Sequence, residues 1–332
     1  MYSWEEEGSS SGSGGMRSTS SGATHSQARV AYRQPTTHDA SRSASSMAQN
    51  SAMSNARKAP IGQIIQSLAT HVALIRWDCT GSNASNEEIF RKKLPLLYQE
   101  AAKDFPDLEI SFGVVGDAYS DNYPLQIRQP NKGPALGDDI NALYSEGGGG
   151  GQGMETYELM AEYDVKRVEI PNAVMPLHFL LCDEGFYPKT NPQHVRDYIG
   201  IQSEAIPSGQ IFAQLQQKYN AWVLRCKYSS GYGEESKIHA QWQQAFGVER
   251  VLMLDEPARV VDCILGIMAH VAGTTDAFVQ SLTSRQTGAQ VKSVMNSLRF
   301  VHQSVTSKGS GNSIVSGPRT SRRAPLQSKK LV

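Results

Sequence analysis

The pattern of hydrophobic and polar positions divides the chain into three parts. Residues 1–60 contain one Val and no Ile, Leu or Phe, and Ser, Gly, Ala, Thr and Gln dominate them. From Ile61 onwards apolar runs alternate with amphipathic stretches, and from about Thr306 the polar composition returns. A segment with few apolar groups cannot offset the entropy cost of ordering. The pattern therefore predicts one folded body between disordered segments at 1–60 and 306–332.

Within the body, short apolar runs predict strands, and apolar positions at helical spacing predict helices. The predicted strands cover residues 71–78, 108–115, 124–128, 175–182, 221–226 and 251–254. The predicted helices cover residues 61–70, 83–104, 134–144, 155–164, 208–219, 237–246, 257–271 and 286–300. Because strands and helices alternate, we expect an α/β fold with a doubly wound, mostly parallel central sheet flanked by helices.

The charges are unevenly distributed, although the net charge is zero. Residues 61–276 carry 17 basic and 28 acidic side chains, whereas residues 277–332 carry nine basic and no acidic ones. We divide the chain into a disordered tail at 1–60, an α/β domain at 61–275, a C-terminal helical extension at 276–305 and a basic disordered tail at 306–332. A basic tail is suited to contact with nucleic acid, with an anionic surface or with the acidic body itself.

The cysteines and the N-terminus bear on the cellular compartment. Each of the four cysteines lies in an apolar run, and the chain contains no CxxC motif. This arrangement is typical of buried free thiols: Cys79, Cys182, Cys226 and Cys263. No apolar segment follows Met1, and no apolar run is long enough to span a bilayer. We therefore expect no transmembrane segment and a reduced, intracellular location, either cytoplasmic or nuclear.

Carboxylates and hydroxyls follow three of the predicted strands. Asp78 ends the first strand and is followed by Thr80 and Ser82, Asp117 follows the second strand, and Asp183 follows the strand at 175–182. In a doubly wound sheet the carboxyl ends of the strands line the ligand site. Oxygen ligands without His or Cys suit a hard cation such as Mg²⁺ or Mn²⁺. The sequence therefore predicts a divalent-cation site at this edge of the sheet.

These features resemble the von Willebrand factor A domain family over roughly residues 68–275. The segments that carry the resemblance are Asp78-Cys-Thr80-Gly-Ser82, Phe112-Gly-Val-Val-Gly-Asp117, the Gly147–Gly153 loop with Glu155, and His178-Phe-Leu-Leu-Cys-Asp183-Glu184. The resemblance implies a metal-ion-dependent adhesion site in which Asp78, Thr80, Ser82 and Asp183 hold Mg²⁺ or Mn²⁺. The family's metal-contacting Thr precedes a middle helix, where this chain offers Gln152, Glu155 and Thr156.

The resemblance implies a protein-interaction module without catalysis. An acidic side chain of a partner protein would complete the coordination of the cation. We expect the rim of the site at residues 119–123, 147–153 and 184–188. The aromatic side chains of this rim, a residue type enriched in interface cores, are Tyr119, Tyr123, Phe186 and Tyr187.

The alternative is a Mg²⁺-dependent phosphotransferase, because Asp78-x-Thr-Gly-Ser is also similar to the nucleophile loop of the haloacid dehalogenase family. Asp78 would attack phosphorus, and Asp117 and Asp121 would match the late acidic motif. That family also needs a Ser/Thr strand end and a Lys between the two motifs, and only about 35 residues separate them here. The position of its general acid is Thr80, which cannot do that job near neutral pH. The glycine run lacks the Lys-Ser/Thr of a phosphate-binding loop. The sequence therefore favours a binding module that is not an enzyme.

Overall fold

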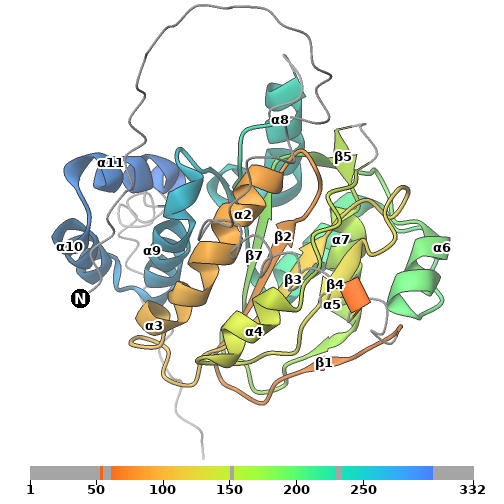
Figure 1. Ribbon diagram of the computed structural model, residues 1–332, viewed down its shortest axis with the longest axis horizontal. Helices are drawn as coiled ribbons and strands as arrows, with labels where there is room; N and C mark the ends of the chain where they lie inside the picture. Colours follow the sequence, from red (N-terminus) through yellow and green to blue (C-terminus); the bar gives the residue numbers. More distant parts are fainter. Residues whose placement is uncertain (1–52, 55–60, 150–152, 229–233, 302–332) are drawn as a thin grey trace, which may run out of the picture.

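The structure is a computed structural model that describes residues 53–54, 61–149, 153–228 and 234–301 (Figure 1). The predicted disordered tails lie outside these residues, apart from residues 53–54. Gly150, Gly151 and Gln152 of the glycine-rich loop also lie outside them.

The centre of the fold is a six-stranded sheet in the order β10-β9-β7-β2-β3-β4. Its strands are β2 (Val72–Asp78), β3 (Glu109–Val115), β4 (Leu125–Ile127), β7 (Leu177–Cys182), β9 (Asn220–Arg225) and β10 (Val251–Met253). All neighbouring pairs are parallel except β3 and β4. Every residue of β2 and β7 is buried, which explains why their sequences are mostly apolar runs without alternation. The predicted α/β fold with a mostly parallel central sheet is confirmed.

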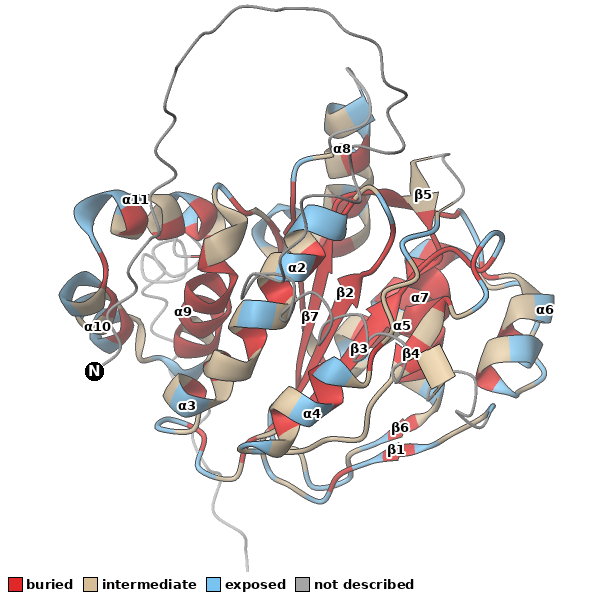
Figure 2. Ribbon diagram, in the orientation of Figure 1, coloured by how far each residue is buried: buried red, intermediate tan, exposed pale blue. Residues whose placement is uncertain are grey.

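Helices cover both faces of this sheet (Figures 1 and 2). Side chains alternate along β2, so that Ile75 and Trp77 lie on one face and Leu74 on the other. The first face packs against α2 (Ala84–Lys93), α3 (Leu97–Ala101), α4 (Ala135–Asn141) and α9 (Val260–Ala272), and α10 (Thr275–Arg285) and α11 (Gly288–Ser297) pack in turn on α9. The second packs against α5 (Tyr157–Lys166), η2 (Val195–Ile199), α7 (Ser208–Lys218) and α8 (Glu234–Phe246).

Three helix predictions need correction. The segment 61–70 is not a helix: its β1 (Ile65–Gln66) pairs in parallel with β6 (Val168–Glu169). The predicted helix 83–104 is interrupted by the 3₁₀ turn η1 (Leu94–Leu96), because Pro95 has no N–H group to continue the α-helical hydrogen bonds. The extension contains two helices, α10 and α11, where the pattern predicted one at 286–300.

The helical extension shares the core of the α/β domain. Phe278, Leu282 and Leu298 belong to the same buried cluster as the sheet face beneath α9. A Cβ atom at Gly266 of α9 would collide with Leu298, so the glycine allows this close approach. Arg259 donates to the Gln286 side chain at 3.0 Å, which joins the start of α9 to the segment between α10 and α11. The extension therefore covers α9 and continues the core of the domain.

Candidate metal centre

The two predicted acidic ligands lie at the ends of neighbouring strands. Asp78 is the last residue of β2, and Asp183 directly follows β7. The two strands pair in parallel, with Trp77 opposite Leu181, so both strands end at the same edge of the sheet. Asp78 and Asp183 are both almost completely buried. The fold therefore brings together two carboxyl groups that are about one hundred residues apart in the sequence.

Hydroxyl groups connect these two carboxyls in a continuous row. The Thr80 hydroxyl donates to Asp78 Oδ1 at 2.5 Å and lies 3.3 Å from the Ser82 hydroxyl. The Ser82 hydroxyl in turn donates to Asp183 Oδ1 at 3.5 Å. All four residues predicted as metal ligands are thus neighbours in the structure. Thr80 is buried, whereas Ser82 is half-buried and lies next to exposed Gly81.

The Asp78 carboxylate is held from both sides. Its Oδ1 also accepts the Thr80 backbone N–H at 2.7 Å, and its Oδ2 accepts the hydroxyl of Tyr157 at the start of α5. The Asn83 side-chain amide donates to the Asp78 carbonyl at 2.9 Å. Burial raises the pKa of Asp78, and the bonds from Thr80 and Tyr157 oppose this rise. The carboxylate is therefore fixed in one orientation before any ligand binds.

Two further carboxyl groups surround the row. Burial, followed by the charges of Asp78 and Glu184, raises the pKa of Glu155 to about 11. Burial and the Asp78 charge also raise the pKa of Asp183 to about 9 and that of Glu184 to about 7. One oxygen each of Glu155, Asp183 and Glu184 is buried without a hydrogen-bond partner among the described residues. The largest causes of these raised pKa values are burial and the negative charge of neighbouring carboxylates, both of which a bound cation would offset.

The donor set fits a hard divalent cation. Asp78, Thr80, Ser82 and Asp183 provide oxygen only, and the second oxygen of Asp183 has no hydrogen-bond partner among the described residues. Within the described ranges, no group of three or more His, Cys, Asp and Glu side chains is arranged to hold an ion. A cation at this place would therefore depend on two carboxylates and two hydroxyls, with its other positions open to water or a partner.

The Thr156 hydroxyl makes its hydrogen bonds to the segment that follows β3. It donates to the Gly116 carbonyl at 2.6 Å and accepts the Ala118 N–H at 3.2 Å, so it ties α5 to the end of β3. The neighbouring Glu155 lies nearer to the site, because Glu155 and Thr80 both lie against Gly149. A Cβ atom built on this glycine would be 3.2 Å from Glu155 Oε1 and 3.4 Å from Thr80 Cβ. Of the three side chains considered for the family's metal-contacting Thr, Gln152 is outside the described residues.

Asp117 and Asp121 order the loop beside the site. Asp121 Oδ2 accepts the Asp117 backbone N–H at 2.8 Å, and its Oδ1 accepts the Gly149 N–H at 3.0 Å. Asp117 accepts the Tyr119 N–H at 3.1 Å and the Tyr187 hydroxyl at 3.2 Å. Both carboxylates are therefore occupied in holding the 117–121 turn against the segments that enclose the site.

The expected aromatic rim is only partly exposed. Tyr119 is 54% exposed, and its ring lies 4.4 Å from the ring of His194 and 4.7 Å from that of Tyr187. Tyr187 is largely buried, and the exposed rim expected at Phe186 is wrong, because its ring is buried against Phe212. Tyr123 is half-buried and packs edge-on against Tyr144.

Two residues of the site were not predicted from the sequence. Tyr157 donates to Asp78, and Arg225 at the end of β9 donates to the Asp183 carbonyl at 2.6 Å. Arg225 could have been found from the sequence, because it is a charged residue at the end of a buried strand. The helix predicted from Glu155 begins instead at Tyr157, so the direction of the Tyr157 hydroxyl could not be predicted.

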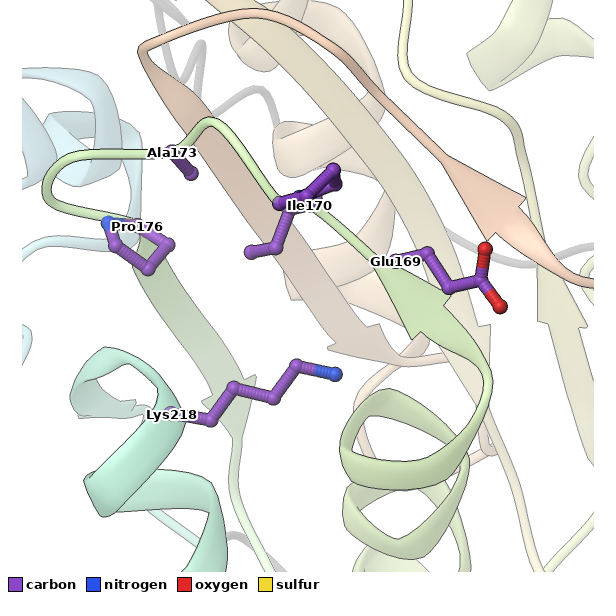
Figure 3. A pocket seen from close by; sticks show the side chains of 6 residues that line it. Glu169, Ile170, Ala173, Pro176 and Lys218 are labelled. Carbon is purple, nitrogen blue, oxygen red and sulfur yellow. The ribbon is translucent and has the colours of Figure 1, made fainter.

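A separate hollow of about 510 Å³ lies at the other end of β7 (Figure 3). Ile170, Ala173 and Pro176 line it, and the Lys218 side chain extends along its edge. The Lys218 ammonium donates to the carbonyls of Asp164, Val165 and Val168, so its hydrogen atoms are used by the fold. The six-residue strand β7, about 20 Å long, separates this hollow from Asp183.

Comparison with known proteins gave similarities at the level of the chain trace. No protein-family model matches the sequence, and no curated protein matches it either. The pilus adhesin SpaC from Lactobacillus rhamnosus GG in its open conformation is similar with a TM-score of 0.45 and 10% identity over 66% of this chain. Proximal thread matrix protein 1 from the mussel byssus is similar with a TM-score of 0.42 and 8% identity over 61% of this chain. The match spans 31% of the adhesin and 48% of the mussel protein.

The remaining predictions concern the thiols and the membrane. All four cysteines are buried and free, as the sequence predicted. Among the helices that the structure describes, none combines the length and the apolar character needed to cross a bilayer.

Proposed function

We propose that the chain is a protein-interaction module of the von Willebrand factor A type, which binds a partner through a divalent-cation site and performs no catalysis. The observation that carries this proposal is the row of oxygens from Asp78 to Asp183 at the ends of two adjacent strands. One buried oxygen of Asp183 has no hydrogen-bond partner in the described part of the chain, and two further carboxyls of raised pKa lie beside it. Both observations support a cation at this place.

Asp78, Thr80, Ser82 and Asp183 would hold Mg²⁺ or Mn²⁺. When bound, the cation supplies a positive charge with open coordination positions, to which an acidic side chain of a partner protein can bind. Tyr157 and the Thr80 N–H hold Asp78 in place without changing its ligand role. Ser82 and Gly81 are the least buried part of the site, so we propose that the partner approaches from their side.

The exposed ring of Tyr119 would contribute to the contact with the partner. It lies on the loop that Asp117 and Asp121 order, and it packs edge-on against the ring of His194 and at a tilt against that of Tyr187. Rigid aromatic side chains lose little conformational entropy on binding and are enriched in interface cores. The proposed partner surface therefore combines an acidic group for the cation with an apolar patch for Tyr119.

The residue at position 80 favours binding over nucleophilic attack by Asp78. A phosphotransferase of the haloacid dehalogenase type needs a general acid at this position, and a Thr hydroxyl cannot do that job near neutral pH. In the structure this hydroxyl donates to Asp78 Oδ1 at 2.5 Å. We therefore keep the binding role as the proposed function.

Thermal unfolding of the full chain in EDTA, Mg²⁺ and Mn²⁺ tests this proposal. A ligand that binds only the native state at one hundred times its dissociation constant stabilises it by about 2.7 kcal/mol, which raises the midpoint by roughly 5–10 °C in a domain of this size. We expect this rise in the wild type and in Ser284→Ala, where the serine is exposed on α10, and its loss in Ser82→Ala and Asp183→Asn. A wild-type midpoint that does not change at millimolar Mn²⁺ would contradict the proposal.

A further inference from the structure

Helix α8 holds the backbone of the segment that carries Asp183 and Glu184. The Trp242 indole N–H donates to the Glu184 carbonyl at 2.8 Å. The Gln241 side-chain amide donates to the Phe186 carbonyl at 2.8 Å and accepts the Phe186 N–H at 3.3 Å. One side-chain amide thus satisfies both the N–H and the carbonyl of Phe186. It fixes the backbone at this residue in the way that a neighbouring strand would.

Gly185 allows this approach. A Cβ at this position would lie 2.5 Å from Gln241 Oε1 and 3.3 Å from the Gly153 carbonyl, so any side chain would displace the amide or the neighbouring strand. The Gly185 N–H donates to the same Gly153 carbonyl at 3.0 Å. These contacts belong to the short parallel pair of β5 (Met154–Glu155) and β8 (Gly185–Phe186). The segment held by α8 therefore also positions Glu155.

Arg225 holds the same segment from the side of the sheet. It is the last residue of β9, it is completely buried, and it donates to the Asp183 carbonyl at 2.6 Å. Its other terminal nitrogen pairs with Glu235 of α8 at 2.8 Å. Glu235 also accepts the Tyr228 N–H at 2.9 Å. The guanidinium group thus connects α8 to the main chain of a proposed metal ligand.

We propose that Gln241, Trp242 and Arg225 are positioning residues for the cation site. This inference rests on the proposed function, because it requires Asp183 to be a ligand. The three side chains contact the backbone from Asp183 to Phe186 and leave the proposed ligand oxygens free. They set the direction in which the Asp183 carboxylate leaves the strand. Outer-shell groups that orient ligands typically change metal affinity by about 10- to 100-fold when they are removed.

Titration of the full chain with Mn²⁺, followed by calorimetry and by the electron paramagnetic resonance spectrum of the bound ion, tests this inference. We expect Gln241→Ala to weaken Mn²⁺ binding at least about tenfold and to alter the spectrum. The matched control is Gln244→Ala, the same substitution at an exposed position of the same helix, which should bind Mn²⁺ as the wild type does. Trp242→Phe keeps an aromatic ring and removes the N–H donor. Arg225→Lys keeps the positive charge and removes the planar guanidinium group, which bonds the Asp183 carbonyl and Glu235 at the same time.

The outcomes separate the inference from the proposed function. Absence of Mn²⁺ binding by the wild type would overturn the proposed function and the inference together. Binding by the wild type, with equal affinity and an unchanged spectrum in Gln241→Ala and Trp242→Phe, would overturn the inference alone. A lower unfolding midpoint without metal, combined with unchanged Mn²⁺ affinity, would also overturn it, since that is the result of a purely structural role.

Discussion

Replacing Asp164 by Asn leaves the Arg76 guanidinium buried without its counter-charge. Arg76 of β2 donates to both oxygens of Asp164 on α5, at 2.9 and 2.8 Å, and neither side chain is exposed. His178 lies 3.0 Å from the same carboxylate. Removing one partner of a buried ion pair typically costs about 3–5 kcal/mol, because the remaining charge stays buried. We expect Asp164→Asn to lower the free energy of unfolding by this amount at pH 7.

The same pair predicts how stability depends on acid. Burial raises the pKa of Asp164, but the charge of Arg76 and the bonds from His178 and Arg76 outweigh burial and lower this pKa to about 2. A carboxyl whose pKa is lower in the folded state stabilises the protein above its ordinary pKa near 4, and this contribution disappears as the pH falls towards 2. This difference in pKa corresponds to about 2 kcal/mol of stability. The wild type should lose this stability as the pH falls from about 4 to about 2, whereas Asp164→Asn should not.

Urea unfolding at pH 7 and along a series down to pH 2 measures both effects. A double-mutant cycle with Arg76→Met isolates the pair, and we expect the double variant to lose at least about 2 kcal/mol less than the sum of the single variants. Glu88→Gln, which removes the exposed pair with Lys92, is the control and should cost at most about 0.5 kcal/mol. A cost of Asp164→Asn similar to that control, or additive single variants, would refute the reasoning.

Three further predictions concern packing and accessibility. A Cβ at Gly113 of β3 would lie 2.6 Å from Ile127 Cδ1, so Gly113→Ala should destabilise the protein by about 1–3 kcal/mol. A Cβ at Gly137 of α4 would have no atom within 4 Å, so Gly137→Ala should stabilise the protein by about 0.5–1 kcal/mol. Urea unfolding compares the two variants, and equal effects would contradict the described packing. Thr156→Val should lower the free energy of unfolding by about 1–3 kcal/mol, because the Ala118 N–H and the Gly116 carbonyl each lose a hydrogen-bond partner. The variant should bind Mn²⁺ with an affinity within twofold of the wild type. A large loss of affinity would show that this hydroxyl reaches the cation. All four thiols are buried and burial raises their pKa, so a thiol reagent should label the native chain only at the rate of unfolding; rapid labelling would show that a cysteine is accessible.

The sequence predicted the central sheet well because its strands are buried on both faces. The runs that became β2, β3 and β7 are mostly apolar, and the strand boundaries differ from the predictions by one or two residues. The segment 61–70 failed because its two-residue strand is held by backbone bonds to residues 167 and 169, about one hundred positions away. No local pattern contains that partner. Two-residue strands such as β5 and β8 were missed for the same reason.

The residues of the candidate site that lie at strand ends could be predicted from the sequence. Asp78, Thr80 and Ser82 share one loop, and Asp183 follows the neighbouring strand, so parallel pairing is sufficient to bring them together. The groups that hold them come from α5, α8 and β9, and their register depends on the packing of whole helices. Phe186 was misplaced on the surface, because a buried aromatic ring and an exposed one give the same sequence signal in a loop.

The position of the helical extension has a consequence for synthesis of the chain. Helix α9 is buried along almost its entire length, and part of its cover is α10 and α11, which come later in the sequence. At a synthesis rate of roughly 5–20 residues per second, the last ~30 residues of this cover appear about 2–6 s after α9. During that interval the apolar side of α9 is available to other nascent chains and to chaperones. A premature stop between α9 and α11 should therefore yield a product that aggregates rather than a smaller functional domain.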